Sequence, residues 1–197
     1  MTEFRSWEDF FWPGTEVLRN TLGIREQDRL DAAERALTYG RLVELRAHHT
    51  VAGRFDLAHL QAIHGYLFQD VYAWAGHLRT FGLIKGDSEF CRPEHLTSYA
   101  AEVFGRLAAN DFLRELDRDS FVHEAAELLG DLNALHPFRD GNGRSQRAFL
   151  ELLSDAAGHP IVWPASIEAR NVTASIASLH GDNAGLRELI ADSLARP

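Results

Sequence analysis

Cysteine is nearly absent from this chain of 197 residues, in which Cys91 is the single example. One cysteine excludes any disulfide within the chain and fits a reducing compartment such as the cytoplasm. We expect Cys91 to be a small packed side chain rather than a reactive thiol, because free cysteines in proteins mostly behave as small apolar residues.

Long hydrophobic runs are absent as well. No apolar stretch approaches the roughly 18 residues that a membrane span requires, although 45% of the residues are hydrophobic. Residues 1–14, "MTEFRSWEDFFWPG", lack the basic start, apolar middle and small-residue cleavage site of a signal peptide. We therefore expect a soluble, cytoplasmic protein with no membrane partner.

Positive charge is in deficit, because 20 basic residues stand against 29 acidic ones and the formal net charge is -9. This balance disfavours a general electrostatic grip on nucleic acid, and direct nucleic-acid binding is not expected. A local basic cluster can still bind phosphate within an acidic protein.

Flexible linkers, repeats and low-complexity tracts are missing too, which predicts a single domain over residues 1–197. Apolar residues at helical spacing predict an all-α bundle of helices. We expect Asp56 to cap the second of these helices and Asp119 or Ser120 to cap the fourth. The predicted helices lie at 27–49, 55–76, 93–110, 119–135, 144–158 and 182–195.

One segment interrupts the helical pattern. Residues 79–91, "RTFGLIKGDSEFC", carry β-branched and aromatic residues on both sides of a Lys-Gly-Asp turn, which predicts a short β-hairpin or extended flap. A lone hairpin is only marginally stable without packing or a ligand. The flap is therefore a candidate for a mobile functional element.

Residues 136–147, "HPFRDGNGRSQR", concentrate unusual chemistry between two predicted helices. A glycine loop that leads into a helix presents unpaired N–H groups and the positive end of the helix dipole, a combination that binds anions. Gly141 and Gly143 allow a phosphate to approach these N–H groups closely. Asn142 between them can donate its side-chain amide to a phosphate oxygen, and Phe138 is expected to anchor the loop in the core.

Charged residues around the glycines extend this prediction. Arg144 and Arg147 lie three residues apart in the first turn of the following helix, so both guanidinium groups can reach one di- or triphosphate. Asp140 would repel phosphate unless a cation such as Mg²⁺ lay between them, and one carboxylate beside phosphate oxygens suits this ion. His136 can act as a general base near neutral pH. Asp-Gly-Asn-Gly alone is also an ordinary turn sequence, but the spaced His, Asp and two Arg favour a phosphate site.

The stretch resembles the signature of the Fic family, with no position missing: His136, Phe138, Asp140, Gly141, Asn142, Gly143, Arg144 and Arg147. Residues 55–80 and the segment "IKGDSEF" also look like the helix and flap that precede the motif in this family. The resemblance implies an all-α Fic fold, with a core at about 55–160, a flap at about 79–91 and the motif at 136–147.

This resemblance also implies an activity, the transfer of AMP from ATP to a Tyr, Ser or Thr hydroxyl of a target protein. His136 would take the hydroxyl proton, Asp140 would hold Mg²⁺, and Asn142 with the glycine N–H groups would cradle the α- and β-phosphates. Arg144 would stabilise the leaving pyrophosphate and Arg147 would reach the γ-phosphate. Lys85 and Gly86 at the flap turn would lie over ATP or position the target, and a solvated turn is an equally good interpretation of Lys85.

Self-inhibiting members of the family carry a helix in which Ser or Thr is followed, four residues later, by Glu and then by Gly or Asn. No glutamate in this chain precedes Gly or Asn. The chain therefore resembles the stand-alone toxin type, in which a small antitoxin supplies the inhibitory glutamate to Arg147. Type II topoisomerases are a target class for similar toxins.

Other interpretations remain beside adenylyl transfer. Some relatives transfer other phosphate-containing groups, and a non-catalytic nucleotide-binding regulatory module would use the same loop, although binding alone needs no base such as His136. Residues 123–127, "HEAAE", lack the second histidine of a zinc-protease motif.

Overall fold

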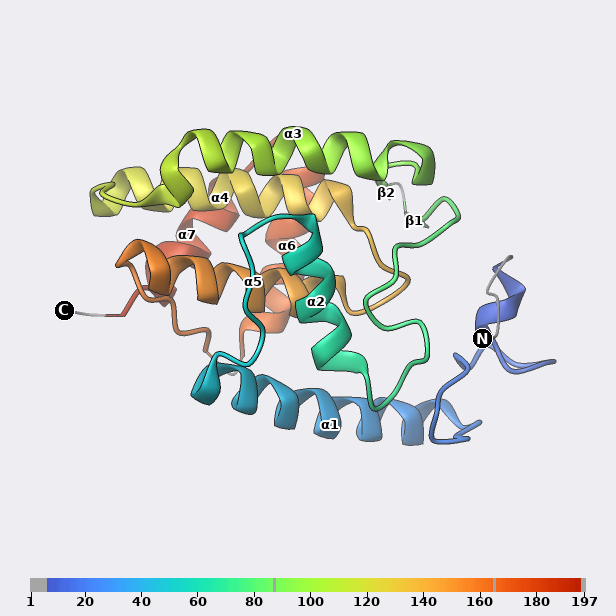
Figure 1. Ribbon diagram of the computed structural model, residues 1–197. Helices are drawn as coiled ribbons and strands as arrows, with labels where there is room; N and C mark the ends of the chain where they lie inside the picture. Colours follow the sequence, from blue (N-terminus) through green and yellow to red (C-terminus); the bar gives the residue numbers. More distant parts are fainter. Residues whose placement is uncertain (1–6, 87, 165, 196–197) are drawn as a thin grey trace.

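The structure is a computed structural model, and it describes residues 7–86, 88–164 and 166–195, apart from the side chains of residues 85 and 88. The described part is all-α with one short hairpin, as predicted (Figure 1). Its elements are α1 (Gln27–His48), α2 (Leu57–Phe68), β1 (Ile84–Lys85), β2 (Ser88–Glu89), α3 (Leu96–Ala109), α4 (Arg118–Leu135), α5 (Asn142–Ala157), α6 (Ile167–Leu179) and α7 (Ala184–Ser193).

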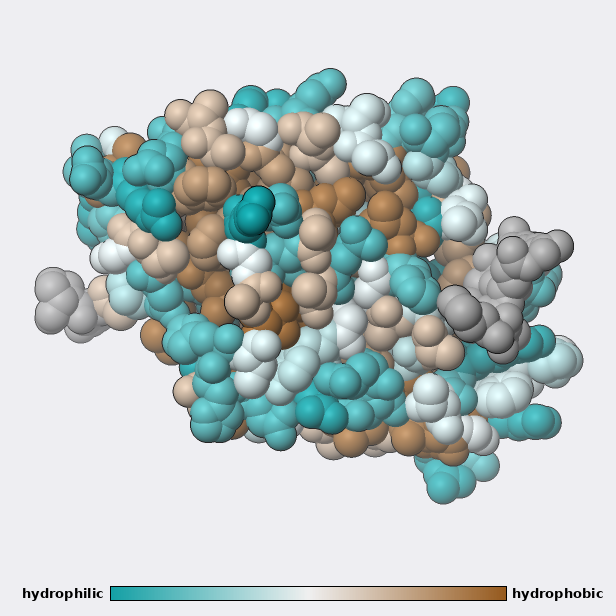
Figure 2. Space-filling model, in the orientation of Figure 1, coloured by the Kyte–Doolittle hydropathy of each residue, from teal (hydrophilic) through white to brown (hydrophobic). Residues whose placement is uncertain are grey.

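The central helices are α4 and α5, which lie between α1 on one side and α3 on the other (Figure 1). Helix α4 buries apolar residues on several faces and thereby forms the middle of the core. Figure 2 shows the same face of the molecule, where hydrophobic residues reach the surface mainly between α1 and α3. The largest fully buried side chains include Phe68, Phe121, Phe138 and Phe149.

Helix ends follow the expected chemistry with one difference. Asp56 caps α2 by accepting a hydrogen bond from His59 N at 2.8 Å, and Gly158 ends α5 in the left-handed conformation at φ 83°. The expected cap of α4 at Asp119 or Ser120 is wrong, because Asp117 accepts from the N–H groups of both residues. The cap thus lies two or three residues before the predicted one, and the helix begins at Arg118 instead of 119.

The N-terminal segment covers the base of the flap and the motif loop. Phe10 packs against Phe81 and Trp74 with ring centroids 5.2 and 5.9 Å away. The guanidinium of Arg139, inside the motif, lies 3.9 Å from the ring centre of Trp7. This segment therefore joins residues that lie far apart in the sequence.

Among the described residues, no helix is both long and apolar enough to span a membrane.

Candidate active site

The motif forms a loop between the end of α4 and the start of α5, as the sequence predicted. His136 ends α4 with φ 40°, and Gly141 precedes α5 with φ 75°, so both residues adopt the left-handed conformation. A Cβ at Gly141 would lie 2.3 Å from Phe68 Cζ, so only glycine fits there. The positive φ and the close approach of Phe68 together explain why the chain has glycine at the start of α5.

Asn142 braces this loop from inside. Its Oδ1 accepts from Phe138 N at 2.9 Å, and its Nδ2 donates to Phe138 O at 2.9 Å. Phe138 is fully buried and stacks on His64 with ring centroids 3.9 Å apart, which anchors the loop in the core as expected. Only one of the two Nδ2 hydrogens is used in this way, so donation from the Asn142 side chain to phosphate stays a prediction. Its backbone N–H and that of Gly143 open α5 and have no acceptor within the helix.

His136 is buried, and its orientation identifies the nitrogen that can act as a base. Nδ1 lies 3.3 Å from Asn133 O, and a carbonyl oxygen only accepts, so Nδ1 carries the hydrogen. In the neutral ring Nε2 is then the unprotonated nitrogen. The ring of Phe90, at the end of the flap, stacks on the imidazole at 3.9 Å. The flap thus contacts the candidate base directly.

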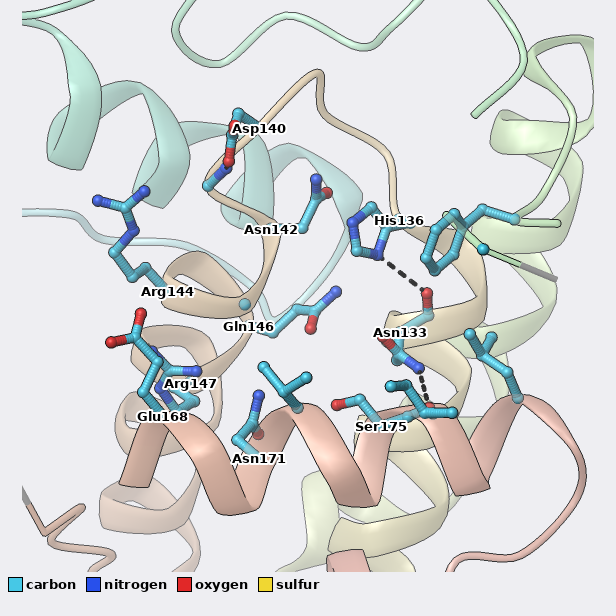
Figure 3. A pocket seen from close by; sticks show the side chains of 17 residues that line it. Asn133, His136, Asp140, Asn142, Arg144, Gln146, Arg147, Glu168, Asn171 and Ser175 are labelled. Carbon is cyan, nitrogen blue, oxygen red and sulfur yellow. Dashed lines mark hydrogen bonds between the residues drawn. The ribbon is translucent and has the colours of Figure 1, made fainter. Parts of the chain in front are cut away.

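The two motif arginines point in different directions (Figure 3). Arg144 turns toward α1, where Nη2 lies 2.5 Å from Glu34 Oε1 and Nη1 donates to Thr38 Oγ1 at 3.3 Å. Arg147 lies over α6 beside Glu168, and within the described chain its guanidinium forms no ion pair within 4.0 Å. Burial lowers the pKa of Arg147 while Glu168 opposes this shift. Arg147 therefore remains available as an anion ligand.

Asp140 stands at the turn above the start of α5 (Figure 3). Its Oδ1 accepts from Gly141 N at 2.6 Å, and its backbone carbonyl accepts from His64 Nε2 at 3.0 Å. Within the described ranges, no three His, Cys, Asp or Glu side chains group as metal ligands. A metal ion here would need ligands from a bound molecule in addition to Asp140.

Several motif residues line a single cavity of about 540 Å³. His136, Asp140, Gly141, Arg144 and Arg147 line it, and Gly86 at the flap turn reaches its edge. Of the predicted site residues, Lys85 has its backbone in β1, but its side chain lies outside the described part of the structure. The cavity thus brings together the motif and the flap turn.

Helix α6 forms the floor of the cavity and was not predicted from the sequence (Figure 3). The residues that it contributes are Glu168, Asn171, Val172, Ser175, Ile176 and Leu179, which follow the helical spacing of three and four residues. Val172 and Ile176 are about half exposed and make one end of the cavity apolar, whereas the arginines make the other end basic. An elongated molecule with an apolar group and several phosphates fits this polarity.

Comparison with known proteins identifies the family of this chain. A family profile described as Fic/DOC family matches residues 54–154. The chain is 39% identical over 188 residues to the probable protein adenylyltransferase y4lH of Sinorhizobium fredii, covering 94% of this chain and 96% of that protein. The protein adenylyltransferase VbhT of Bartonella schoenbuchensis is 42% identical over 183 residues, which are 92% of this chain and 38% of VbhT. The chain belongs to the Fic/DOC family.

Solved structures have the same fold. The Bartonella effector protein BepC from Bartonella tribocorum, with bound AMPPNP, aligns with a TM-score of 0.88 and 27% identity, covering 96% of this chain and 98% of that chain. The N-terminal Fic domain of a putative cell filamentation protein from Bartonella quintana, with bound ADP, aligns with a TM-score of 0.88 and 29% identity over 95% of each chain. The predicted all-α Fic fold is thereby confirmed.

Proposed function

We propose that this chain is an ATP-dependent protein adenylyltransferase, which transfers AMP from ATP to a Tyr, Ser or Thr hydroxyl of a target protein. The observation that carries the proposal is one cavity that is lined both by His136, whose Nδ1 faces the carbonyl of Asn133, and by Asn142 and Gly143 at the start of α5. Relatives at 39–42% identity are named protein adenylyltransferases, and two similar structures hold adenine nucleotides.

The residues have distinct roles in this reaction. The hydroxyl oxygen of the target attacks the α-phosphorus, its proton passes to His136 Nε2, and the bond between the α-phosphorus and the bridging oxygen breaks to release pyrophosphate. The N–H groups of Asn142 and Gly143 bind phosphate oxygens. Arg147 holds the γ-phosphate, and Arg144 stabilises charge on the pyrophosphate from the side of α1.

Mg²⁺ is the metal that fits Asp140. A carboxylate oxygen beside a phosphate loop is a hard ligand, and this ion is commonly held by one or two carboxylates plus phosphate oxygens. When bound, Mg²⁺ would neutralise charge on the α- and β-phosphates. In the protein, Gly141 N fixes the Asp140 carboxylate through Oδ1.

The flap is the expected docking element for the target. Strands β1 and β2 pair through Ile84 with Glu89 and Lys85 with Ser88, and Ile84 is 66% exposed. A strand edge with an exposed apolar side chain suits the addition of an extended target segment. Lys85 and Gly86 at the turn would then lie between the target and ATP. Transfer of another phosphate-containing group is the alternative that uses the same loop, and a non-catalytic nucleotide-binding module is a second.

We extend the proposal to a toxin and antitoxin pair. Arg147 has no carboxylate within ion-pair distance in the described chain, and the sequence has no glutamate followed by Gly or Asn. A small antitoxin that brings a glutamate to Arg147 would occupy the γ-phosphate position. A type II topoisomerase is the proposed class of target, and ATP as co-substrate fits the cytoplasm.

The test is incubation with a bacterial lysate and ATP labelled on the α-phosphate. We expect a discrete labelled protein, and we expect His136→Ala to reduce labelling by about a hundredfold or more while ATP binding persists. Label that enters only from the γ-phosphate would show a different transfer. Unchanged labelling by His136→Ala would refute the role of this residue as the base.

A further inference from the structure

Arg79 is a buried arginine, only 3% exposed, and it forms no ion pair with any carboxylate in the described part of the chain. Its guanidinium donates to carbonyl oxygens instead. Nε lies 2.8 Å from His136 O and Nη1 lies 2.7 Å from Phe81 O, while Nη2 donates to Cys91 O and lies 3.4 Å from Leu135 O. A buried charge of this kind calls for a reason beyond packing.

One reason for a buried arginine at this position is that it caps the C-terminal end of α4. A helix leaves its last carbonyl groups without partners inside the helix, and a cation is favourable at that end. Arg79 supplies a donor to Leu135 O, its backbone N–H donates to Pro137 O at 2.9 Å, and Cys91 N donates to Ala134 O at 2.9 Å. The helix that ends at His136 is therefore capped by residues from both ends of the flap segment.

The flap is held by the same guanidinium. Phe81 precedes the hairpin and Cys91 follows it, so Arg79 closes the base of the flap by binding both carbonyls. Just inside that base, Phe90 N donates to Leu83 O at 3.1 Å and the Phe90 ring stacks on His136. One side chain thus contacts the backbone of the candidate base and both ends of the element that contacts its ring.

We propose that Arg79 is a positioning residue that holds the flap and His136 as one structural unit, so that docking of a target on the flap fixes the orientation of the base. The inference rests on the proposed adenylyl transfer. A planar guanidinium with five N–H donors can reach four carbonyl oxygens, whereas the compact ammonium of lysine cannot keep this set. Arg79→Lys therefore keeps the positive charge but cannot form the hydrogen bonds to all four carbonyl oxygens.

The first test needs no variant. Native-state hydrogen exchange of the wild-type protein measures the opening free energy of the amides of Phe90, Cys91 and His136. If Arg79 holds the flap and His136 as one structural unit, these three amides should open together with the same free energy. Separate values, with the flap amides opening while His136 stays protected, would overturn the proposal whatever the activity of the protein.

The second test compares Arg79→Lys with Arg106→Lys, which changes an exposed arginine on α3 that pairs with Asp131 outside the cavity. Thermal unfolding, ATP affinity by calorimetry, and the rate of labelling of a lysate protein at saturating ATP are measured for each. We expect Arg79→Lys to bind ATP within twofold of wild type and to label at least about tenfold more slowly, since a misplaced base loses part of its catalytic effect. Arg106→Lys should match wild type in both.

A labelling rate for Arg79→Lys within twofold of wild type would overturn the proposal. Equal losses of ATP affinity and rate would indicate a merely structural role and would also overturn it. A wild-type protein that labels nothing would contradict the proposed function instead, and the exchange experiment would still decide whether Arg79 joins the flap to His136.

Discussion

At the scale of single residues, the two glycines of the motif serve different purposes. Gly141 has φ 75° and faces Phe68, so a side chain there is strained in conformation and also clashes. Gly143 lies inside α5, where an added Cβ would meet Arg147 Nη1 at 3.4 Å, an ordinary contact. The first glycine is thus required by the fold, and the second keeps space open beside the anion ligand.

This difference predicts a separation of stability from binding. Gly141→Ala should lower the free energy of unfolding by about 2 kcal/mol or more, because both the left-handed conformation and the overpacking against Phe68 are costly. Gly143→Ala should unfold at the wild-type temperature or above, since alanine favours helix by up to about 1 kcal/mol over glycine. It should nevertheless bind ATP more weakly. Thermal denaturation and ATP titration check both variants, and a stable Gly141→Ala would refute the steric argument.

At the scale of elements, α1 and α5 are joined through one carboxylate. Glu34 on α1 accepts hydrogen bonds from Arg144 and from the hydroxyl of Tyr72, and the Arg144 guanidinium lies 4.6 Å from the ring centre of Phe68. Glu34 therefore competes with any phosphate for Arg144. The pair ties α1 to the motif helix and directs Arg144 away from Arg147.

Glu34→Gln should consequently change stability and binding in opposite directions. Loss of a partly buried ion pair should lower the melting temperature, whereas removal of a negative charge beside the cavity should strengthen ATP binding by about threefold to tenfold. The matched control is Asp131→Asn, because Asp131 likewise joins an arginine, Arg106, to a tyrosine hydroxyl, that of Tyr99. The control should lose stability without a change in ATP affinity. Weaker ATP binding by Glu34→Gln would mean that Glu34 orients Arg144 for the phosphate instead.

The helices around the motif could be predicted from the sequence, whereas the contacts between distant helices could not. The helix, glycine loop and helix around the motif were predicted from the apolar spacing of the two helices and from the glycines between them. The direction of Arg144 depends on Glu34, which lies 110 residues earlier in the chain, and no local pattern reveals such a partner. Helix α6 was missed because it buries few apolar residues, so its apolar spacing is weak.

At the scale of the whole molecule, His64 joins three separate parts of the chain. It belongs to α2, its Nδ1 accepts from Gly76 N at 2.8 Å, and its Nε2 donates to Asp140 O at 3.0 Å. The ring is fully buried and stacks on Phe68 and Phe138. The neutral ring satisfies both hydrogen bonds, so a second proton would break the bond from Gly76 N and place a charge in the core.

This arrangement makes stability depend on pH in a defined direction. Burial lowers the pKa of His64 to about 4, below its usual value of 6.5, so the unfolded chain takes up a proton at higher pH than the folded protein does. The contribution of His64 to stability is therefore complete above pH 6.5 and is lost as the pH falls toward 4, by up to about 1.4 kcal/mol per pH unit. Burial also lowers the pKa of His59, which adds to the same trend.

Urea denaturation between pH 7.5 and 4.5 tests this expectation with His64→Gln, in which the amide can still donate and accept but does not titrate. The variant should be less stable than wild type at pH 7.5, because glutamine cannot reproduce the ring stacking, and its stability should decline less steeply with acid, so that the two curves converge. His95→Gln, at an exposed position before α3, should keep the wild-type slope. If His64→Gln lost stability as steeply as wild type, the acid sensitivity would have to come from other groups.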